Sequence, residues 1–236
     1  MLGFIASYFS FKPFNLNSST IGYLNEKNLL IFILLGYICM SFFRSLVQSA
    51  WNFSFERMYG TLEFIYLSPA NRFGIILGNA LSSLFESVWV MAVFSLIVFL
   101  TKRQYFNINF LAACIVFVIM IILAIMWGMF LNSMFLFSRD SAFLFTILEE
   151  PMEIFSGVKV PTMVFPFWAK LLSFIFPLTY ALDAIRKVFL NGESLYEVRG
   201  FIGISVFIII LLFVIIETCL IQGEKHAKIT GNMTLF

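Results

Sequence analysis

The sequence carries little charge. Only 12% of its 236 residues are Asp, Glu, Lys or Arg, whereas 61% are hydrophobic and the mean hydropathy is +0.97. Because soluble globular domains average about 25% charged residues, this composition excludes that class and indicates a polytopic membrane protein. The net charge of +2 is too small, and the basic residues too scattered, for a nucleic-acid-binding protein.

Residue types that carry common chemistry are also scarce. The one histidine, His226, lies in the polar C-terminal tail, which argues against an intramembrane metalloprotease or a Ser/His hydrolase. Cys39, Cys114 and Cys219 lie far apart in apolar segments, without the spacing of a metal site or redox pair. The phosphate-binding pattern GxxxxGK(S/T) does not occur in this sequence. We therefore expect no catalytic residue, no metal site and no bound cofactor in this chain.

Long apolar runs dominate the sequence. A helix needs about twenty mainly apolar residues to cross about 30 Å of hydrocarbon. Segments 29–50, 73–100, 108–137 and 201–222 meet this length, and 142–155 is a shorter fifth one. Residues 1–28 combine a partial apolar span with a polar linker. The sequence thus predicts one all-α transmembrane domain over residues 1–236, with five clear spans and a short N-terminal one.

Segment 156–192 follows a different pattern. Prolines divide it, and its apolar stretch 165–176 is too short to cross a bilayer. We expect re-entrant or interfacial short helices here. On such a helix, Asp183 could pair with Arg186 and Lys187, three and four positions later.

Small residues recur every four positions in two of the predicted spans, which places them on one helix face and lets another backbone approach closely. The first stripe is Gly74, Gly78 and Ser82, and the second is Ala124, Gly128 and Asn132. The partner helix belongs either to the same chain or to a second copy; the spacing does not decide between them.

Four carboxylates lie in or beside the apolar runs. Glu86 is in the middle of the second span, so we expect it to face the bundle interior or a transport pathway. Glu149, Glu150 and Glu153 end the shorter fifth segment. They predict either an acidic mouth that faces water or a role in gating or in admitting a cationic substrate.

A charged island, ERMYGTLEFIYLSPANR, separates the first two long spans at residues 56–72. Gly60 can end a helix through a positive φ, and Thr61 can cap the next helix. Glu63 then lies in the positively polarised first turn, and Pro69 stops the helix. The pattern predicts a helical stub over residues 61–67 at one membrane face.

Three blocks of residues, in this order and spacing, resemble the ABC-2 type permeases, the membrane subunits of a class of ATP-driven exporters. The blocks are Glu56, Arg57, Gly60, Thr61, Leu62, Glu63, Ser68, Pro69 and Arg72; Ser156, Gly157, Val158 and Pro161; and Pro177, Leu178, Thr179, Tyr180, Ala181, Asp183, Ala184 and Arg186. The resemblance implies that segment 51–72 is a cytoplasmic coupling segment that docks on a separate ATP-binding subunit. It also implies that 156–192 folds back into the membrane on the outer side.

The resemblance has further implications. The chain would pair with a second permease, the same or related, and the outer gate would include Glu149, Glu150, Glu153, Gly157, Pro177, Tyr180, Asp183 and Arg186. ATP and Mg²⁺ would bind the partner subunit. The topology would place Arg44, Arg57, Arg72, Lys225 and Lys228 inside and Lys102 and Arg103 outside. We expect a multi-pass protein of a prokaryotic cell membrane.

Three readings of function remain open at this point. The first is export of a drug, peptide or other amphipathic compound, with polysaccharide or lipid as the alternative cargo. The second is an ion-coupled secondary transporter or channel, which would call for inverted repeats or a selectivity filter that the sequence does not display. The third is a membrane enzyme that acts on lipid, against which the single tail histidine argues.

Overall fold

The computed structural model describes residues 29–59, 71–102, 109–134 and 141–230, and within these ranges it is helical without a β-strand. The long helices are α2 (Leu29–Met58), α4 (Arg72–Lys102), α5 (Phe110–Met134) and α9 (Leu195–Thr230). The shorter elements are α6 (Ser141–Phe155), η2 (Thr162–Val164), α7 (Phe167–Ser173), α8 (Pro177–Arg186) and η3 (Lys187–Asn191). The all-α prediction is therefore confirmed for the described part of the chain.

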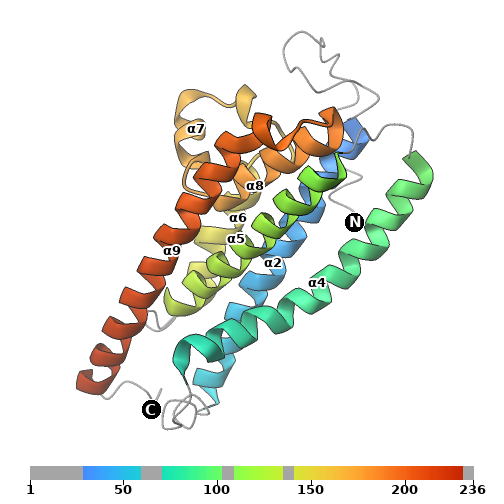
Figure 1. Ribbon diagram of the computed structural model, residues 1–236. Helices are drawn as coiled ribbons and strands as arrows, with labels where there is room; N and C mark the ends of the chain where they lie inside the picture. The colour runs from blue at the N-terminus through green and yellow to red at the C-terminus, as the bar shows by residue number, and fades with distance from the viewer. Residues whose placement is uncertain (1–28, 60–70, 103–108, 135–140, 231–236) are drawn as a thin grey trace.

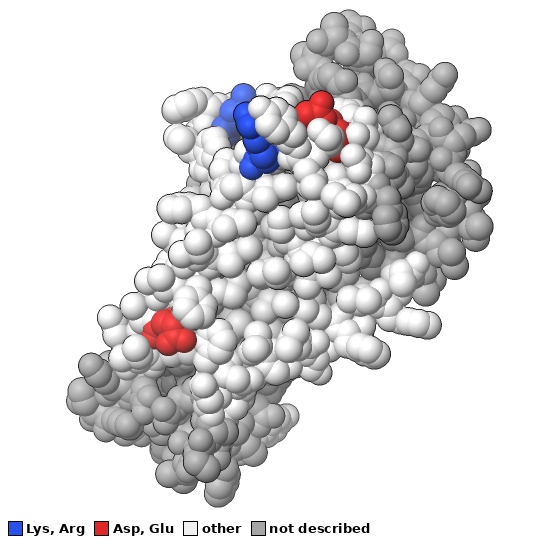
Figure 2. Space-filling view, in the orientation of Figure 1, with Lys and Arg blue, Asp and Glu red and all other residues white. Residues whose placement is uncertain are grey.

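Helix α5 forms the centre of the bundle, in contact with α2, α4, α8 and α9 (Figure 1). Half of its apolar span is buried inside the chain, compared with 22% of the span of α9. The outward side chains of α9 are large and apolar, for example Phe207 and Ile210. Figure 2 shows a broad uncharged band on this face, with charges towards its two ends. Such a surface suits lipid rather than water.

Asparagine side chains begin two of the long helices. The Oδ1 of Asn71 accepts a hydrogen bond from the backbone N–H of Phe73, at 3.1 Å, where α4 begins. The Oδ1 of Asn109 accepts one from Ala112, at 3.4 Å, at the start of α5. Both bonds satisfy N–H groups that have no partner within the helix.

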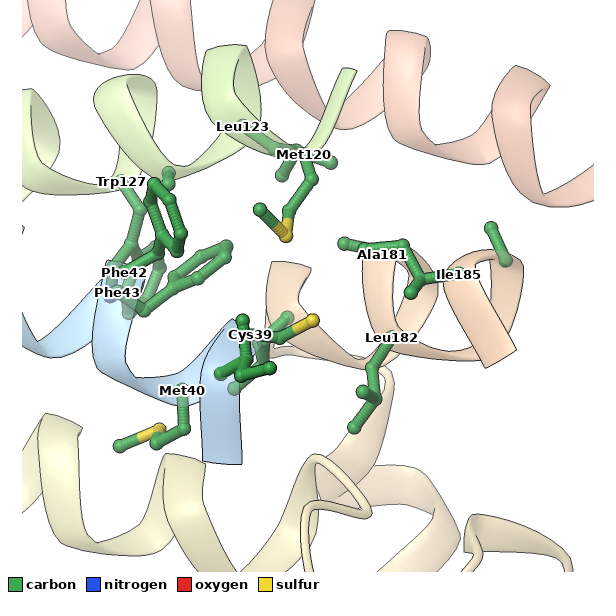
Figure 3. Close-up of a cluster of buried hydrophobic side chains, with 14 of the residues drawn as sticks. Cys39, Met40, Phe42, Phe43, Met120, Leu123, Trp127, Ala181, Leu182 and Ile185 are labelled. Carbon is green, nitrogen blue, oxygen red and sulfur yellow. The ribbon is translucent and has the colours of Figure 1, made fainter. Parts of the chain in front are cut away.

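The core joins α2, α5 and α8. In Figure 3 the aromatic side chains of Phe42 and Phe43 from α2 lie beside Trp127 of α5, and Leu182 of α8 lies nearby. All four side chains belong to one buried cluster. Since the three helices are far apart in the sequence, this cluster ties the second half of the chain to the first.

Two described helices are long and apolar enough to cross a membrane, namely 111–134 in α5 and 195–222 in α9. A third candidate is the pair formed by α7 and the continuous segment 177–191, which is bent by 96°. Segments 31–46 and 73–89 form shorter apolar helices within the residues searched. Five clear spans therefore stay a prediction.

The short helices predicted for residues 156–192 are present. Pro166 directly precedes α7, and Pro177 occupies the first turn of α8, where its missing N–H costs nothing. Phe176, between the two helices, has an extended backbone, with φ −89° and ψ 121°. The bend places α7 and α8 at one end of the bundle, whereas α2 ends and α4 begins at the opposite end, near the end of α9 (Figure 1).

Candidate functional site

Among the described residues, one side of α2 is less deeply buried than the rest of the helix. From residue 31 to 46, every described side chain is buried except Tyr37, Ser41, Arg44 and Ser45. Their spacing places them along one side of the helix. We call this set the open stripe of α2. All four residues are polar or carry a polar group, although α2 is otherwise apolar here.

Arg44 lies in the open stripe and joins α2 to α6 through two ion pairs. Its Nε donates to Glu149 Oε1 at 2.6 Å, and its Nη2 donates to Glu153 Oε2 at 2.9 Å. The other oxygen of Glu153 accepts from Lys159 Nζ at 2.7 Å. The result is a chain of alternating charges, Glu149, Arg44, Glu153 and Lys159, which we call the charged cluster.

Burial differs sharply along the charged cluster. The side chain of Arg44 is 56% exposed and that of Lys159 39% exposed, whereas Glu153 is 19% and Glu149 4% exposed. The carboxylates therefore lie inside and the cations outside. The hydrogen bond from Lys159 to Glu153 raises the pKa of the Lys159 ammonium, so this lysine stays charged.

Local geometry explains why these residues meet. Glu149 and Glu153 are four positions apart on α6, so both carboxylates project toward α2. The planar guanidinium of Arg44 can serve two carboxylates at once. After α6, Gly157 has φ 84° and turns the chain back so that Lys159 reaches Glu153. A Cβ at Gly157 would lie 2.8 Å from Thr162 Cγ2, so a larger residue does not fit this turn.

A buried arginine holds the loop that carries Lys159. Arg186 of α8 is fully buried and donates from Nη1 to the Gly157 carbonyl at 2.7 Å and from Nη2 to the Val158 carbonyl at 2.8 Å. Its guanidinium carbon also lies 3.5 Å from the centroid of the Phe32 ring on α2. Thus α8, α2 and the loop after α6 are fixed to one another beside the charged cluster.

The family model described as ABC-2 type transporter matches residues 1–190. The chain belongs to the ABC-2 type transporter family. It is therefore a membrane-embedded transport component, the permease of an ABC transporter, and members of this family are not themselves catalytic enzymes. A search of curated proteins found no match. The resemblance seen in the three sequence blocks is confirmed.

The three predicted outer-gate glutamates of this permease differ in burial. Glu149 is buried against α2, Glu153 is partly buried in the charged cluster, and Glu150 is exposed. The other predicted gate residues lie around α8. Asp183 Oδ2 accepts from Thr162 Oγ1 at 3.5 Å, and the Tyr180 hydroxyl donates to the Phe174 carbonyl at 3.2 Å.

The two cations that were predicted to pair with Asp183 on α8 also make other contacts. Lys187 pairs with Glu193 at 3.6 Å, across the turn that ends in Gly192. Arg186 points into the bundle, toward the carbonyl groups described above. Helical spacing alone predicted partners along α8, whereas burial directs Arg186 to backbone acceptors outside that helix.

The two stripes of small residues have different surroundings. A Cβ at Gly128 would lie 3.0 Å from Leu46 Cβ, so this stripe packs against α2 of the same chain. Asn132 is buried, and its Nδ2 donates to the Gly128 carbonyl at 3.0 Å. Gly74, Gly78 and Ser82 are exposed, and nothing lies within 4 Å of a Cβ placed at Gly78.

Residues 60–70 of the predicted coupling segment lie outside the described residues, and they include Gly60, Thr61, Leu62, Glu63 and Pro69. Glu56 and Arg57 belong to the last turns of α2, and Arg72 is the first residue of α4. Glu86 lies within α4, and its side chain is outside the described part.

The sequence analysis missed the role of Arg44 and Lys159. The family topology assigned Arg44 to the inner side, but the structure places it in the middle of α2, opposite two glutamates of α6. The signal was present, since an arginine inside an apolar run calls for a buried carboxylate partner. Nothing in the local pattern indicated which carboxylate.

Proposed function

We propose that this permease pairs with a second copy, or a related permease, and that the open stripe of α2 and the charged cluster line the cargo pathway between them. The observation that carries this proposal is the side chain of Arg44, which is 56% exposed. At 1.5 Å per residue, the thirty residues of α2 extend about 45 Å, against about 30 Å of hydrocarbon. When α2 crosses the bilayer, its middle therefore lies within the hydrocarbon layer.

An arginine that faces lipid costs about 2.5 to 3.5 kcal/mol at the bilayer centre on insertion scales, and less nearer the edge. The half-buried residues Tyr37, Ser41 and Ser45 lie on the same side of α2. A water-filled pathway or a second protein surface removes this cost. By contrast, the large apolar side chains of α9 suit lipid, so α9 belongs on the outside of the assembly.

The exposed stripe of α4 supports the second copy independently. Gly78 has open space where its Cβ would be, and Gly74 and Ser82 lie exposed on either side of it. Such a surface lets a helix from another chain approach closely. The stripe on α5 already has its partner in α2, so only the stripe on α4 needs one from outside.

Transport would be driven by a separate ATP-binding subunit that holds ATP and Mg²⁺. The coupling segment, residues 51–72, would dock on this subunit and transmit its closure to α2 and α4, which it directly connects. This arrangement fits a multi-pass protein of a prokaryotic cell membrane. The cargo would be a drug, a peptide or another amphipathic compound, with polysaccharide or lipid as the alternative.

Cysteine accessibility tests the pathway. In a chain whose native cysteines are replaced by alanine, we would introduce Ser41→Cys in the open stripe and Phe207→Cys on the lipid-facing side of α9. A charged, membrane-impermeant thiol reagent should modify position 41 at least about tenfold faster than position 207, because thiolates form only in water. Equal, slow modification of both positions in the dimeric complex would reject the pathway.

ATP coupling is tested in proteoliposomes. The permease would be co-purified with a candidate ATP-binding subunit, and uptake of a fluorescent amphipathic cargo into inside-out vesicles would be measured. Uptake should require ATP and disappear when the phosphate-loop lysine of the ATP-binding protein is replaced. Uptake driven by an ion gradient without ATP would support the secondary transporter instead.

A further inference from the structure

We infer that the charged cluster is a binding site for an anionic group of the cargo, such as a carboxylate, phosphate or sulfate, with Arg44 and Lys159 as its ligands. This inference rests on the proposed function, because it requires the open stripe of α2 to face the pathway. It adds the chemical class of the cargo, which neither the family nor the sequence indicates.

The first argument is which side chains are exposed. The two cations are 56% and 39% exposed, whereas the carboxylates between and behind them are 19% and 4% exposed. Although the four residues together are neutral, the accessible surface of the cluster is therefore cationic. An approaching anion meets a guanidinium and an ammonium before it meets either glutamate.

The second argument is the donor capacity that remains. Arg44 donates from Nε and Nη2 to its two glutamates. Its Nη1 donates to no acceptor within the described residues. Lys159 uses one of its three N–H donors for Glu153. Both cations thus keep donors for a ligand, and a guanidinium edge suits the geometry of a carboxylate or phosphate.

The third argument is that the cations are already held in place. Two carboxylates fix the guanidinium of Arg44, and Glu153 bridges it to Lys159. A ligand therefore does not have to order two long side chains, a cost of about 0.5 to 1.5 kcal/mol each. The glutamates also neutralise both cations when the site is empty, which keeps the empty pathway stable.

A cationic ligand fits less well. It would have to displace Arg44 or Lys159 from carboxylates that are already paired and mostly buried. Glu150 is the exposed carboxylate of this region, but it projects about 100° around α6 from Glu149, away from the α2-facing side. It remains beside the site rather than between the two cations.

A matched pair of probes tests the inference. The purified full-length permease, with its ATP-binding partner, would be placed in nanodiscs of neutral phosphatidylcholine. Binding of 11-(dansylamino)undecanoic acid and of its methyl ester would be measured by fluorescence. We expect the acid to bind about tenfold more tightly than the ester, which corresponds to about 1.4 kcal/mol.

The variants are chosen to keep the fold. R44Q/E149Q removes the cation together with its buried partner, so no unpaired buried charge remains, and K159Q changes a partly exposed residue. Each should reduce the acid preference to about threefold or less, and Glu153 keeps one of its two cations in either variant. K170Q, which removes a cation on α7, is the control and should keep the full preference. Equal binding of acid and ester by the unmodified protein, or an undiminished preference in both variants, would overturn the inference.

Two further arms separate the possible explanations. Adding phosphatidylglycerol to the nanodiscs should leave the acid preference intact; its loss would assign the site to a lipid headgroup and reject cargo recognition. ATP-driven transport without an acid preference would reject this inference alone. An acid preference without ATP-driven transport would leave the binding site standing and reject the proposed function.

Discussion

The guanidinium of Arg186 lies 3.5 Å from the centroid of the Phe32 ring, although 154 positions separate the two residues. The same side chain donates to carbonyl groups of the loop after α6. One buried cation thus joins α2, α8 and the loop that carries Lys159. Direct contacts therefore connect α8 with the loop after α6 and, through Lys159, with the charged cluster.

Replacing Arg186 should destabilise the permease strongly. Arg186→Lys keeps the charge but cannot donate to the Gly157 and Val158 carbonyls and stack on Phe32 at once, so we expect a loss of about 2 to 4 kcal/mol. Thermal unfolding of the detergent-purified protein measures it. Arg199→Lys, an exposed arginine on Tyr196, is the control and should change stability by about 0.5 kcal/mol or less. Similar effects of the two changes would contradict this role for Arg186.

Gly36 provides a test of close packing. A Cβ at this position would collide with the Val158 carbonyl oxygen and lie 2.8 Å from Arg186 Nη2. Gly36→Ala should therefore cost about 1 to 3 kcal/mol, despite the better helix propensity of alanine. Gly203→Ala, with nothing within 4 Å of the new Cβ, should be neutral or stabilising. The measurement is the unfolding temperature of each variant, and Gly36→Ala should unfold at a lower temperature than Gly203→Ala. A higher unfolding temperature for Gly36→Ala would reject the packing argument.

Glu149 and Glu150 offer neighbouring carboxylates in opposite surroundings. Glu149→Gln removes the charge from a buried partner of Arg44, and we expect a loss of about 1 to 3 kcal/mol. Glu150→Gln changes an exposed residue and should cost about 0.5 kcal/mol or less. R44Q/E149Q should lose less than the sum of its two single changes, because the pair acts as a unit. Strict additivity in this double-mutant cycle would mean that Arg44 and Glu149 are not coupled.

Sequence reasoning succeeded where the determinants are local. Apolar runs predicted α5 and α9, and the prolines predicted the short helices between residues 156 and 192, because both signals act on their own segment. Small-residue spacing predicted a close contact at Gly128 without naming its partner. Its neighbour proved to be Leu46 of the same chain.

The charged cluster was beyond such reasoning. Arg44 and Glu149 are 105 positions apart, and no periodicity relates them. The sequence analysis singled out Glu149 and Glu153 at the end of the fifth segment, but whether they met water or α2 depended on how the bundle assembles. Arg186 shows the same limit, because spacing along α8 indicated Asp183 as a neighbour but did not indicate the carbonyl groups of a distant loop to which Arg186 donates.

The exposed stripe on α4 should mediate contact between two copies. Gly78→Leu adds a bulky side chain to open space, so the single chain should fold with an unchanged unfolding temperature. If a second helix packs there, the dimer should weaken by about tenfold or more, or about 1.4 kcal/mol. Cross-linking in nanodiscs at graded protein density measures this. Leu81→Ala removes bulk from a neighbouring exposed position and is the control. Unchanged cross-linking in Gly78→Leu would place the dimer contact elsewhere.

Coupling to ATP can be separated from transport at Gly60. Its sequence context predicts a helix end with a positive φ, which leucine adopts only at a cost of about 1 to 2 kcal/mol, whereas asparagine tolerates it. In proteoliposomes with the ATP-binding partner, Gly60→Leu should leave ATP hydrolysis within about twofold of the unmodified complex and abolish most ATP-driven uptake. Gly60→Asn should retain both. The segment joins α2, which carries the open stripe, to α4, which carries the small-residue stripe. If its helix has the wrong orientation, the ATP-binding subunit can hydrolyse ATP without moving these two helices. Full uptake in Gly60→Leu would show that force reaches the pathway by another route.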